Sequence, residues 1–199
     1  MNRQREKLWI LSCISSLLVL FYELFQWAII DVVTPFFTPF LWLLVFGFFF
    51  ITMVRTVIHL FKNKDWKPAA IHAVTILLLI FFPFTKITLN LDFRMNQQER
   101  EQVAKMVEKG ELRPNVSGDA TLIRLPKQYK QLSKGGGEIV IERKNGKCMV
   151  LFFTFRGVLD GFSGFVYSPD DQPPAKHDFA GDFKEIKRMD RNWYWVASY

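Results

Sequence analysis

The chain has 199 residues, of which 50% are hydrophobic and 16% aromatic, and it includes 21 Phe. This Phe content is about twice that of an ordinary soluble domain of the same size, so a single soluble domain is not expected. The net charge of +7 divides into +4 for residues 1–91 and +3 for residues 92–199, where 18 basic residues accompany 15 acidic ones. Because no basic domain stands out, nucleic acid is not an expected partner.

Apolar and charged residues are distributed unevenly along the chain. Of the 21 Phe, 14 lie between Phe21 and Phe93, and residues 1–91 contain only 12 of the 45 charged residues. This division predicts a membrane protein with a transmembrane anchor over residues 1–91 and an extracytoplasmic α+β domain over residues 92–199.

Three apolar stretches, at about residues 8–30, 36–61 and 68–88, are long enough to cross a bilayer as helices. The third is the weakest, because Lys86 interrupts its outer end and Pro83 is expected to kink it. The alternative is that the third stretch is only a buried or interfacial helix, which would leave the C-terminal domain inside the cell.

Basic residues in short flanking segments predict the orientation, because such segments resist translocation. Six of them lie before the first stretch and between the second and third, whereas the first hairpin has none: Arg3, Arg5, Lys7, Lys62, Lys64 and Lys67. A multi-pass protein of the cell membrane is therefore expected, with its N-terminus in the cytoplasm and its C-terminal domain outside.

Ionisable residues within the spans are candidate functional groups, because each is costly in a bilayer unless it is paired or hydrated. Arg55, His59 and His72 fall in the inner leaflet, where Arg55 can extend to the headgroup phosphates. Glu23 cannot extend as far, so either Gln26 and Lys86 are its expected partners or it is protonated.

Beyond Asn96 the pattern predicts a helix that starts at an Asn96/Glu99 capping box and ends at Gly110. Six short strands follow, at residues 121–125, 138–142, 149–155, 164–167, 183–188 and 193–198, and they predict an antiparallel sheet. Asn145-Gly146 is typical of a two-residue hairpin, and Asp190-Arg191-Asn192 predicts a tight turn. The strand at 149–155 is apolar on both faces, which predicts a central position, whereas the charges at 183–188 predict an edge.

Catalytic and metal-binding patterns are scarce in this half. Cys13 and Cys148 are predicted to lie on opposite sides of the membrane, and His177 is isolated in a loop. No cofactor, metal or catalytic group is therefore assigned. Arg156, Asp160 and Tyr167 accompany several aromatic residues and three glycines, which fits either a rim around an aromatic pocket or an ordinary core.

Two further features suggest a binding surface. Tyr194 alternates with Trp193 and Trp195, so it faces away from the side that both Trp share and could meet a partner or the membrane surface. Basic residues form two clusters that favour an anionic surface such as a lipid headgroup or a wall polymer, although a solvated surface explains them as well. The clusters are Arg124, Lys127, Lys130 and Lys134, and Arg143, Lys144 and Lys147.

Together these observations predict a non-catalytic module that binds a ligand or partner outside the cell. Its expected partners are the lipid bilayer and an anionic cell-surface polymer, a headgroup or another membrane protein, with a homo-oligomer as an alternative. A second hypothesis is an accessory or immunity-type subunit of a larger membrane complex, with Glu23 as the polar determinant. A membrane-anchored hydrolase is the third, and it has no adjacent nucleophile and base to support it.

Overall fold

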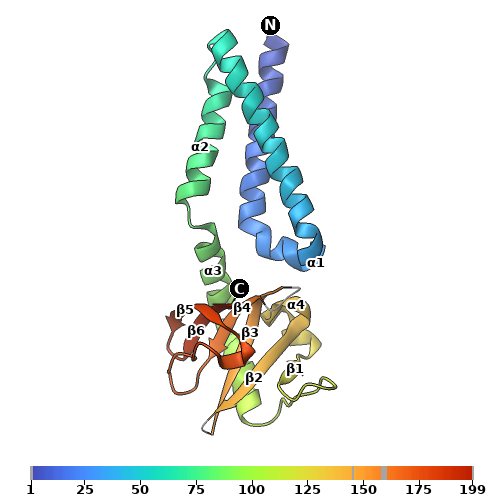
Figure 1. Ribbon diagram of the computed structural model, residues 1–199, viewed down its shortest axis with the longest axis vertical. Coiled ribbons are helices and arrows are strands. Elements are labelled where there is room, and N and C mark those ends of the chain that lie inside the picture. The colour runs from blue at the N-terminus through green and yellow to red at the C-terminus, as the bar shows by residue number, and fades with distance from the viewer. Residues whose placement is uncertain (1, 145, 158–160, 199) are drawn as a thin grey trace. The chain divides into compact units, whose positions relative to one another are not determined.

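The structure is a computed structural model that describes residues 2–144, 146–157 and 161–198. Its elements follow the chain from α1 near the N-terminus to the strands of a C-terminal sheet (Figure 1). The chain divides into two compact units, Met1–Thr88 and Leu89–Tyr199.

The first unit begins with α1 (Asn2–Asn63), which consists of two helices separated at Thr34. Thr34 has φ 69° and ψ 152°, a region that residues with a side chain rarely adopt, and this non-helical residue ends the first helix. The segments Arg5–Ile30 and Phe36–Asn63 are each long and apolar enough to cross a membrane. The first two predicted apolar helices are therefore present in the structure.

The third predicted helix, at residues 68–88, is broken. Helix α2 (Lys67–Phe81) ends before Pro83, and α3 (Phe84–Glu108) continues at an angle of 59° to it. Phe82 is extended, with φ −86° and ψ 123°, as a residue that precedes proline prefers. Pro83 lacks a backbone N–H, so the helical ladder cannot run through it. The described residues thus contain two helices that are long and apolar enough to cross a membrane, or three if the bent pair counts as one.

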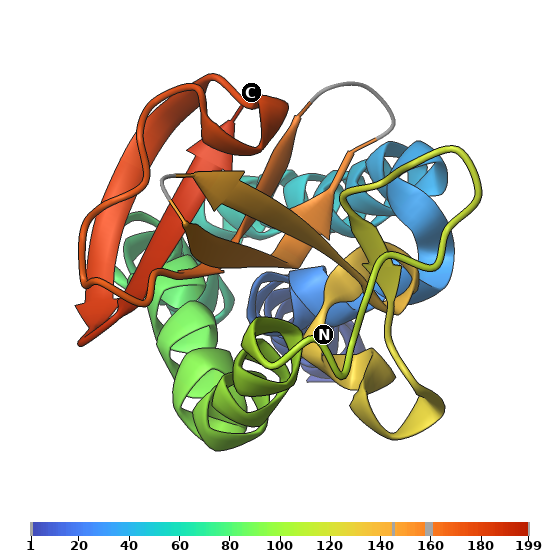
Figure 2. The same cartoon turned by 90° about the horizontal axis from the view of Figure 1, so that it is seen from below.

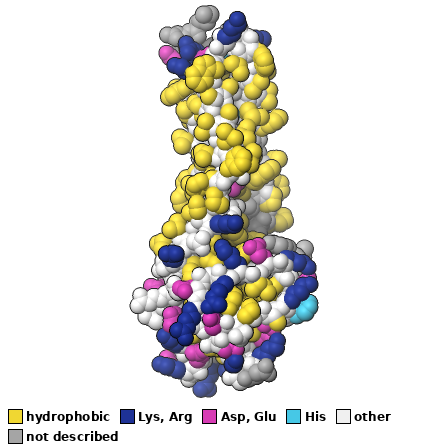
Figure 3. Space-filling model, turned by 90° about the vertical axis from the view of Figure 1, so that its left-hand side faces the viewer, with side chains coloured by type: hydrophobic (Ala, Val, Ile, Leu, Met, Phe, Trp, Pro, Cys, Tyr) yellow, Lys and Arg dark blue, Asp and Glu magenta, His cyan; other side chains and the backbone are white. Residues whose placement is uncertain are grey.

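Apolar side chains cover the outside of the helices in the first unit, whereas charged side chains are mixed over the second unit (Figure 3). Phe36 is 66% exposed and Phe61 is 80% exposed, while a smaller set packs inside: Val19, Tyr22, Val45 and Phe49. An exposed apolar surface on two long helices is compatible with a membrane anchor.

A buried polar cluster joins the helices of the first unit at Ser15, Thr52 and His72. The Thr52 hydroxyl donates to Ser15 Oγ at 2.9 Å, and His72 Nε2 lies 3.2 Å from Thr52 Oγ1 and 3.4 Å from Ser15 Oγ. His72 Nδ1 lies 3.1 Å from the Pro68 carbonyl oxygen. Because a carbonyl can only accept, we assign the proton to Nδ1, which leaves Nε2 as an acceptor. With the Thr52 proton donated to Ser15, the Ser15 hydroxyl is the donor to Nε2. The cluster connects both halves of α1 to α2.

The second unit contains a six-stranded antiparallel sheet in the order β1-β2-β3-β4-β6-β5, in which all six predicted strands are present (Figure 2). As predicted, β3 is an interior strand and β5 an edge strand. The strands are β1 (Leu122–Arg124), β2 (Glu138–Lys144), β3 (Lys147–Arg156), β4 (Phe162–Tyr167), β5 (Phe183–Asp190) and β6 (Trp193–Ser198).

Tight turns connect two of the strand pairs. Lys144 pairs with Lys147, which leaves two residues between β2 and β3, where Gly146 has φ 78° and Asn145 lies outside the described residues. Asp190 pairs with Trp193 across the β5–β6 turn. Asn192 has φ 65° in this turn, a value that Asn tolerates better than most residues do, so the turn predicted at 190–192 is confirmed.

The helix predicted to start at Asn96 starts twelve residues earlier, at Phe84. The Asn96 side chain does not cap a helix end; its amide donates to the Asp92 carbonyl and carboxylate at 3.1 and 2.8 Å. The predicted start was wrong because an Asn one turn after an Asp can bond backward within a continuous helix. The predicted end at Gly110 is correct, since Gly110 has φ 74° and follows the last helical turn.

Two apolar layers lie on opposite faces of the sheet. On one face, Leu89, Phe93 and Val103 of α3 pack against Phe165 and Trp193. The other face is covered by the segment between β4 and β5, which contains the short helix η2 (Asp178–Ala180) and buries Phe179, and this layer also includes Leu151, Val166, Tyr194 and Val196. The second unit therefore has its own core on both faces of its sheet.

Arg100 lies in the middle of the first of these layers and is only 1% exposed. Its guanidinium donates to the Asp92 carboxylate at 2.7 Å, to the Asp92 carbonyl at 3.1 Å and to the Leu132 carbonyl at 3.1 Å. It also lies 4.6 Å from the centre of the Phe165 ring. One side chain thus connects α3 to the sheet and to the segment after β1.

We expect Arg100→Met to lower the free energy of unfolding of the second unit by about 3 kcal/mol, because it removes one partner of a buried ion pair and leaves the Leu132 carbonyl unsatisfied. Hydrogen exchange of β4 and β6 amides, measured on the full chain in detergent, would report the loss. Arg94→Met is the matched control, since Arg94 is exposed on the same helix. Equal protection in both variants would contradict this role of Arg100.

Candidate functional site: a basic pocket

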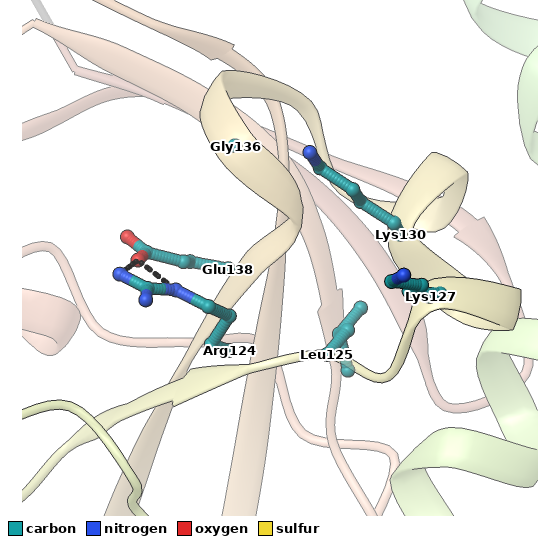
Figure 4. A pocket seen from close by; sticks show the side chains of 6 residues that line it. All are labelled: Arg124, Leu125, Lys127, Lys130, Gly136 and Glu138. Carbon is teal, nitrogen blue, oxygen red and sulfur yellow. Dashed lines mark hydrogen bonds and ion pairs between the residues drawn. The ribbon is translucent and has the colours of Figure 1, made fainter.

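A pocket of about 450 Å³ lies where β1 ends and β2 begins. Between these strands the chain forms η1 (Lys127–Leu132) and the short turn α4 (Lys134–Gly137). The lining residues come from all four elements and are shown in Figure 4: Arg124, Leu125, Lys127, Lys130, Gly136 and Glu138. We call this site the basic pocket.

Main-chain and hydroxyl hydrogen bonds hold the walls of the basic pocket. The Leu125 N–H donates to the Gly137 carbonyl at 2.9 Å, which ties the end of β1 to the turn. The buried Ser133 hydroxyl donates to the Glu138 carbonyl at 2.5 Å and accepts from the Phe153 N–H at 2.9 Å. The pocket is therefore attached to the interior strand β3.

The glycine turn leaves no space for side chains at two of its three positions. Gly135, Gly136 and Gly137 have φ values of 68°, 112° and 75°, which favour glycine. A Cβ on Gly135 would lie 2.8 Å from Arg156 Cβ, and one on Gly137 would lie 2.3 Å from Lys130 Cγ. At Gly136 a Cβ would meet nothing within 4 Å, so the backbone there is open to the pocket.

Two arginines bind the one carboxylate of the basic pocket. Arg124 donates from Nε and Nη2 to Glu138 Oε1 at 3.2 and 3.0 Å, and Arg156 donates from Nη1 to Oε2 at 2.7 Å. Burial raises the pKa of the Glu138 carboxyl, but the two guanidinium groups outweigh it and hold this pKa below its ordinary value. Glu138 is thus ionised at neutral pH and orients both arginines.

Lys127 and Lys130 have no such partner. Both are exposed, and in the part of the chain that the structure describes neither forms an ion pair. In Figure 4, Lys130 extends toward the turn at Gly136, while Arg124 and Glu138 lie on the other side of the pocket. The basic pocket therefore combines two lysines that form no ion pair with Arg124 and Glu138, and Glu138 is also bound by Arg156, which does not line the pocket.

The second predicted basic cluster is compensated by acidic residues. Lys144 pairs with Asp178 at 3.0 Å, and Lys147 pairs with Asp170. These groups line a second pocket of about 160 Å³, in which each lysine faces an aspartate. Arg143 is exposed at the end of the same strand. These pairs could not be predicted from sequence patterns, because their partners are 34 and 23 residues apart.

The structure separates the remaining predicted site residues. Arg156 does not line the basic pocket but donates to Glu138, which does. Tyr167 is only 9% exposed and packs against the Trp193 ring. Tyr194 is 5% exposed, and its hydroxyl donates to the Asp171 carbonyl at 2.8 Å, so it is not available to a partner in this structure. Asp160 lies outside the described residues.

Within the first unit, Glu23 is half-buried and Arg55 is exposed. No ion pair of either side chain is present among the described residues. Gln26, a predicted partner of Glu23, donates instead to the Thr85 hydroxyl at 3.4 Å. The sequence analysis did not identify Ser15 and Thr52 as neighbours of His72, because isolated Ser and Thr in apolar helices give no pattern that distinguishes them.

No three His, Cys, Asp or Glu side chains gather as metal ligands within the described ranges. The chain matches no protein-family model, and neither a curated protein nor a solved structure is significantly similar to it. The evidence for a function therefore comes from the geometry of this chain.

The Lys147 ammonium and the Ser168 hydroxyl hold the pKa of the Asp170 carboxyl at about 2, below its ordinary 3.8. Because the folded pKa is lowered, this contact stabilises the fold above about pH 3.8 and is lost as the pH falls toward about 2. An NMR titration of the Asp170 carboxyl carbon should show this value, and Lys147→Gln should raise it toward 3.8. An Asp170 pKa unchanged in Lys147→Gln would contradict the pairing.

Proposed function

We propose that this chain is a multi-pass protein of the cell membrane that displays a non-catalytic binding module on the outer surface. The observation that carries the proposal is the second unit, which has a core on both faces of its sheet and presents a pocket with two unpaired lysines. A domain with its own core does not need the anchor for its fold, and a pocket with uncompensated charge is suited to hold a charged ligand.

The orientation is part of the proposal and rests on the six basic residues that flank the apolar helices. Segments rich in Lys and Arg stay in the cytoplasm, so three crossings would place the second unit outside. The third crossing requires that α2 and the first turns of α3 together span the bilayer as a bent pair. Pro83 does not prevent this, because a break in a span is tolerated when neighbouring groups satisfy its backbone.

An accessory subunit of a membrane complex is the second candidate. It is favoured by Glu23, which is half-buried in α1 and has no ion-pair partner among the described residues. A carboxylate at that depth is costly in lipid unless another protein provides a partner. In this case the helices, rather than the sheet domain, would carry the recognition.

We expect a membrane-impermeant thiol reagent to label Ser117→Cys in intact cells, because Ser117 is exposed in the second unit. The native Cys13 and Cys148 are first replaced by Ser and Ala. Asn63→Cys, which lies between α1 and α2, is the control and should react only after the membrane is opened. The reverse pattern would place the second unit in the cytoplasm.

We expect the binding module to retain its partner when the anchor is exchanged. Residues 1–81 are replaced by an unrelated three-span anchor, and molecules captured from native membranes by this chain are compared with those captured by the intact chain. The same captured set is expected if the sheet domain recognises the partner. Its loss, with the exchanged chain present in the membrane at the normal level, would instead favour the accessory-subunit function.

A further inference from the structure

We infer that the basic pocket binds a ligand with two or more phosphate groups. This inference rests on the proposed binding function and assigns a chemical class to its ligand. The charged side chains that line the pocket are Arg124, Lys127, Lys130 and Glu138, so three cations and one carboxylate leave a formal charge of +2. Arg156, which does not line the pocket, also binds Glu138. A ligand with several negative charges matches this excess better than a single carboxylate does.

The lysines are arranged to act together. Lys127 and Lys130 are three residues apart on η1, and a 3₁₀ helix has three residues per turn, so both stems leave the helix on the same side. An ammonium group is a compact point charge that suits a phosphate oxygen and does not require the planar geometry of a carboxylate. The pair thus forms one subsite for a phosphate group.

Arg124 forms a second subsite, on the opposite side of the pocket from the lysines (Figure 4). Arg124 and Arg156 use only part of their donors on Glu138, since a guanidinium has five N–H groups and these two contribute two and one to the carboxylate. The buried Leu125 lies between the subsites and separates them (Figure 4). A single small anion cannot occupy both sides at once, whereas a chain of linked phosphates can.

The glycine turn gives a ligand access to the backbone between these subsites. Gly136 lines the pocket and has open space where a Cβ would be, so a phosphate can approach its main chain. Several other basic side chains of the second unit are paired instead. Lys144, Lys147 and Arg188 each bind an aspartate, which cancels their charge toward a ligand.

Phosphate groups of this kind occur in lipid headgroups and in soluble or polymeric phosphates, and the test distinguishes them. The probe is tripolyphosphate, with orthophosphate for comparison, titrated by calorimetry into the full chain in neutral detergent at about 0.15 M salt. We expect tripolyphosphate to bind at least about tenfold more tightly than orthophosphate, because only the longer anion reaches both subsites. Equal affinities would overturn the two-subsite inference.

The variant that tests the site is Lys127→Gln with Lys130→Gln, which should weaken tripolyphosphate binding by about tenfold or more and reduce its salt dependence. The matched control is Lys109→Gln with Arg143→Gln, which removes the same charge from exposed positions outside the pocket and should change binding less than about twofold. Circular dichroism verifies that both variants fold. Equal weakening in the two variants would mean that only net charge matters, and would refute the inference.

Native mass spectrometry of the chain, released from micelles that contain phosphatidylglycerol, shows whether the bound phosphate groups belong to a lipid headgroup. Loss of retained lipid in the Lys127/Lys130 variant, with retention in the control, supports a headgroup source. Unchanged lipid retention together with weakened tripolyphosphate binding supports a soluble or polymeric phosphate.

The failure of this inference can be distinguished from the failure of the proposed function. If the chain with the exchanged anchor still captures its partner but tripolyphosphate does not bind, the phosphate class fails and the binding function stands. If capture is lost but tripolyphosphate binds at the pocket, the proposed function fails and the phosphate site stands.

Discussion

The buried guanidinium of Arg100 is the interaction on which the second unit depends. It is nearly inaccessible to water, and its donors satisfy Asp92 within α3 and the main chain at Leu132. Leu132 is the last residue of η1, so this carbonyl helps to attach the helix that carries the pocket lysines to α3, together with the hydrogen bond from Gln131 to Glu99. The guanidinium also lies over Phe165 of β4, which brings the sheet into the same contact. A cation in an apolar layer is tolerated only when its donors are satisfied, so these three elements are held together.

The basic pocket follows from how charge is distributed around that framework. Elsewhere on the second unit, three basic side chains pair with aspartates of the segment between β4 and β5, which cancels their charge locally: Lys144, Lys147 and Arg188. At the pocket, only Glu138 is available, and two arginines already share it. The lysines of η1 therefore form no ion pair among the described residues. The electrostatic field of positive side chains that no acidic group neutralises attracts anions from about a Debye length away, before any direct contact with the lysines forms.

The first unit uses polar groups differently. In lipid there is little hydrophobic force between helices, so packing and hydrogen bonds must hold a bundle together. The Ser15, Thr52 and His72 cluster provides such bonds between both halves of α1 and α2. The chain reverses at Thr34 and at residues 64–66 and bends by 59° at Phe82–Pro83, and these breaks lie outside the cluster. The polar cluster and the breaks together define the bundle.

The sequence by itself determined the features that depend on local patterns: the apolar stretches, the break at Pro83, the six strands with their turns, and the interior position of β3. These features follow from the periodicity of apolar residues, the length of apolar stretches and the residue types that favour turns, all within about ten residues. Only the tertiary structure decided which charges are paired, because the partners are distant in sequence. Lys144 meets Asp178 where η2 packs beside β2, and Arg156 meets Glu138 because β3 pairs with β2. The capping-box pattern at Asn96 and Glu99 also predicted the wrong start for α3, because an Asn side chain can either cap a helix or form a hydrogen bond within one. Arg100 gave no signal at all, because a basic residue in a helix is usually solvated, and only the packing of α3 on the sheet buries it.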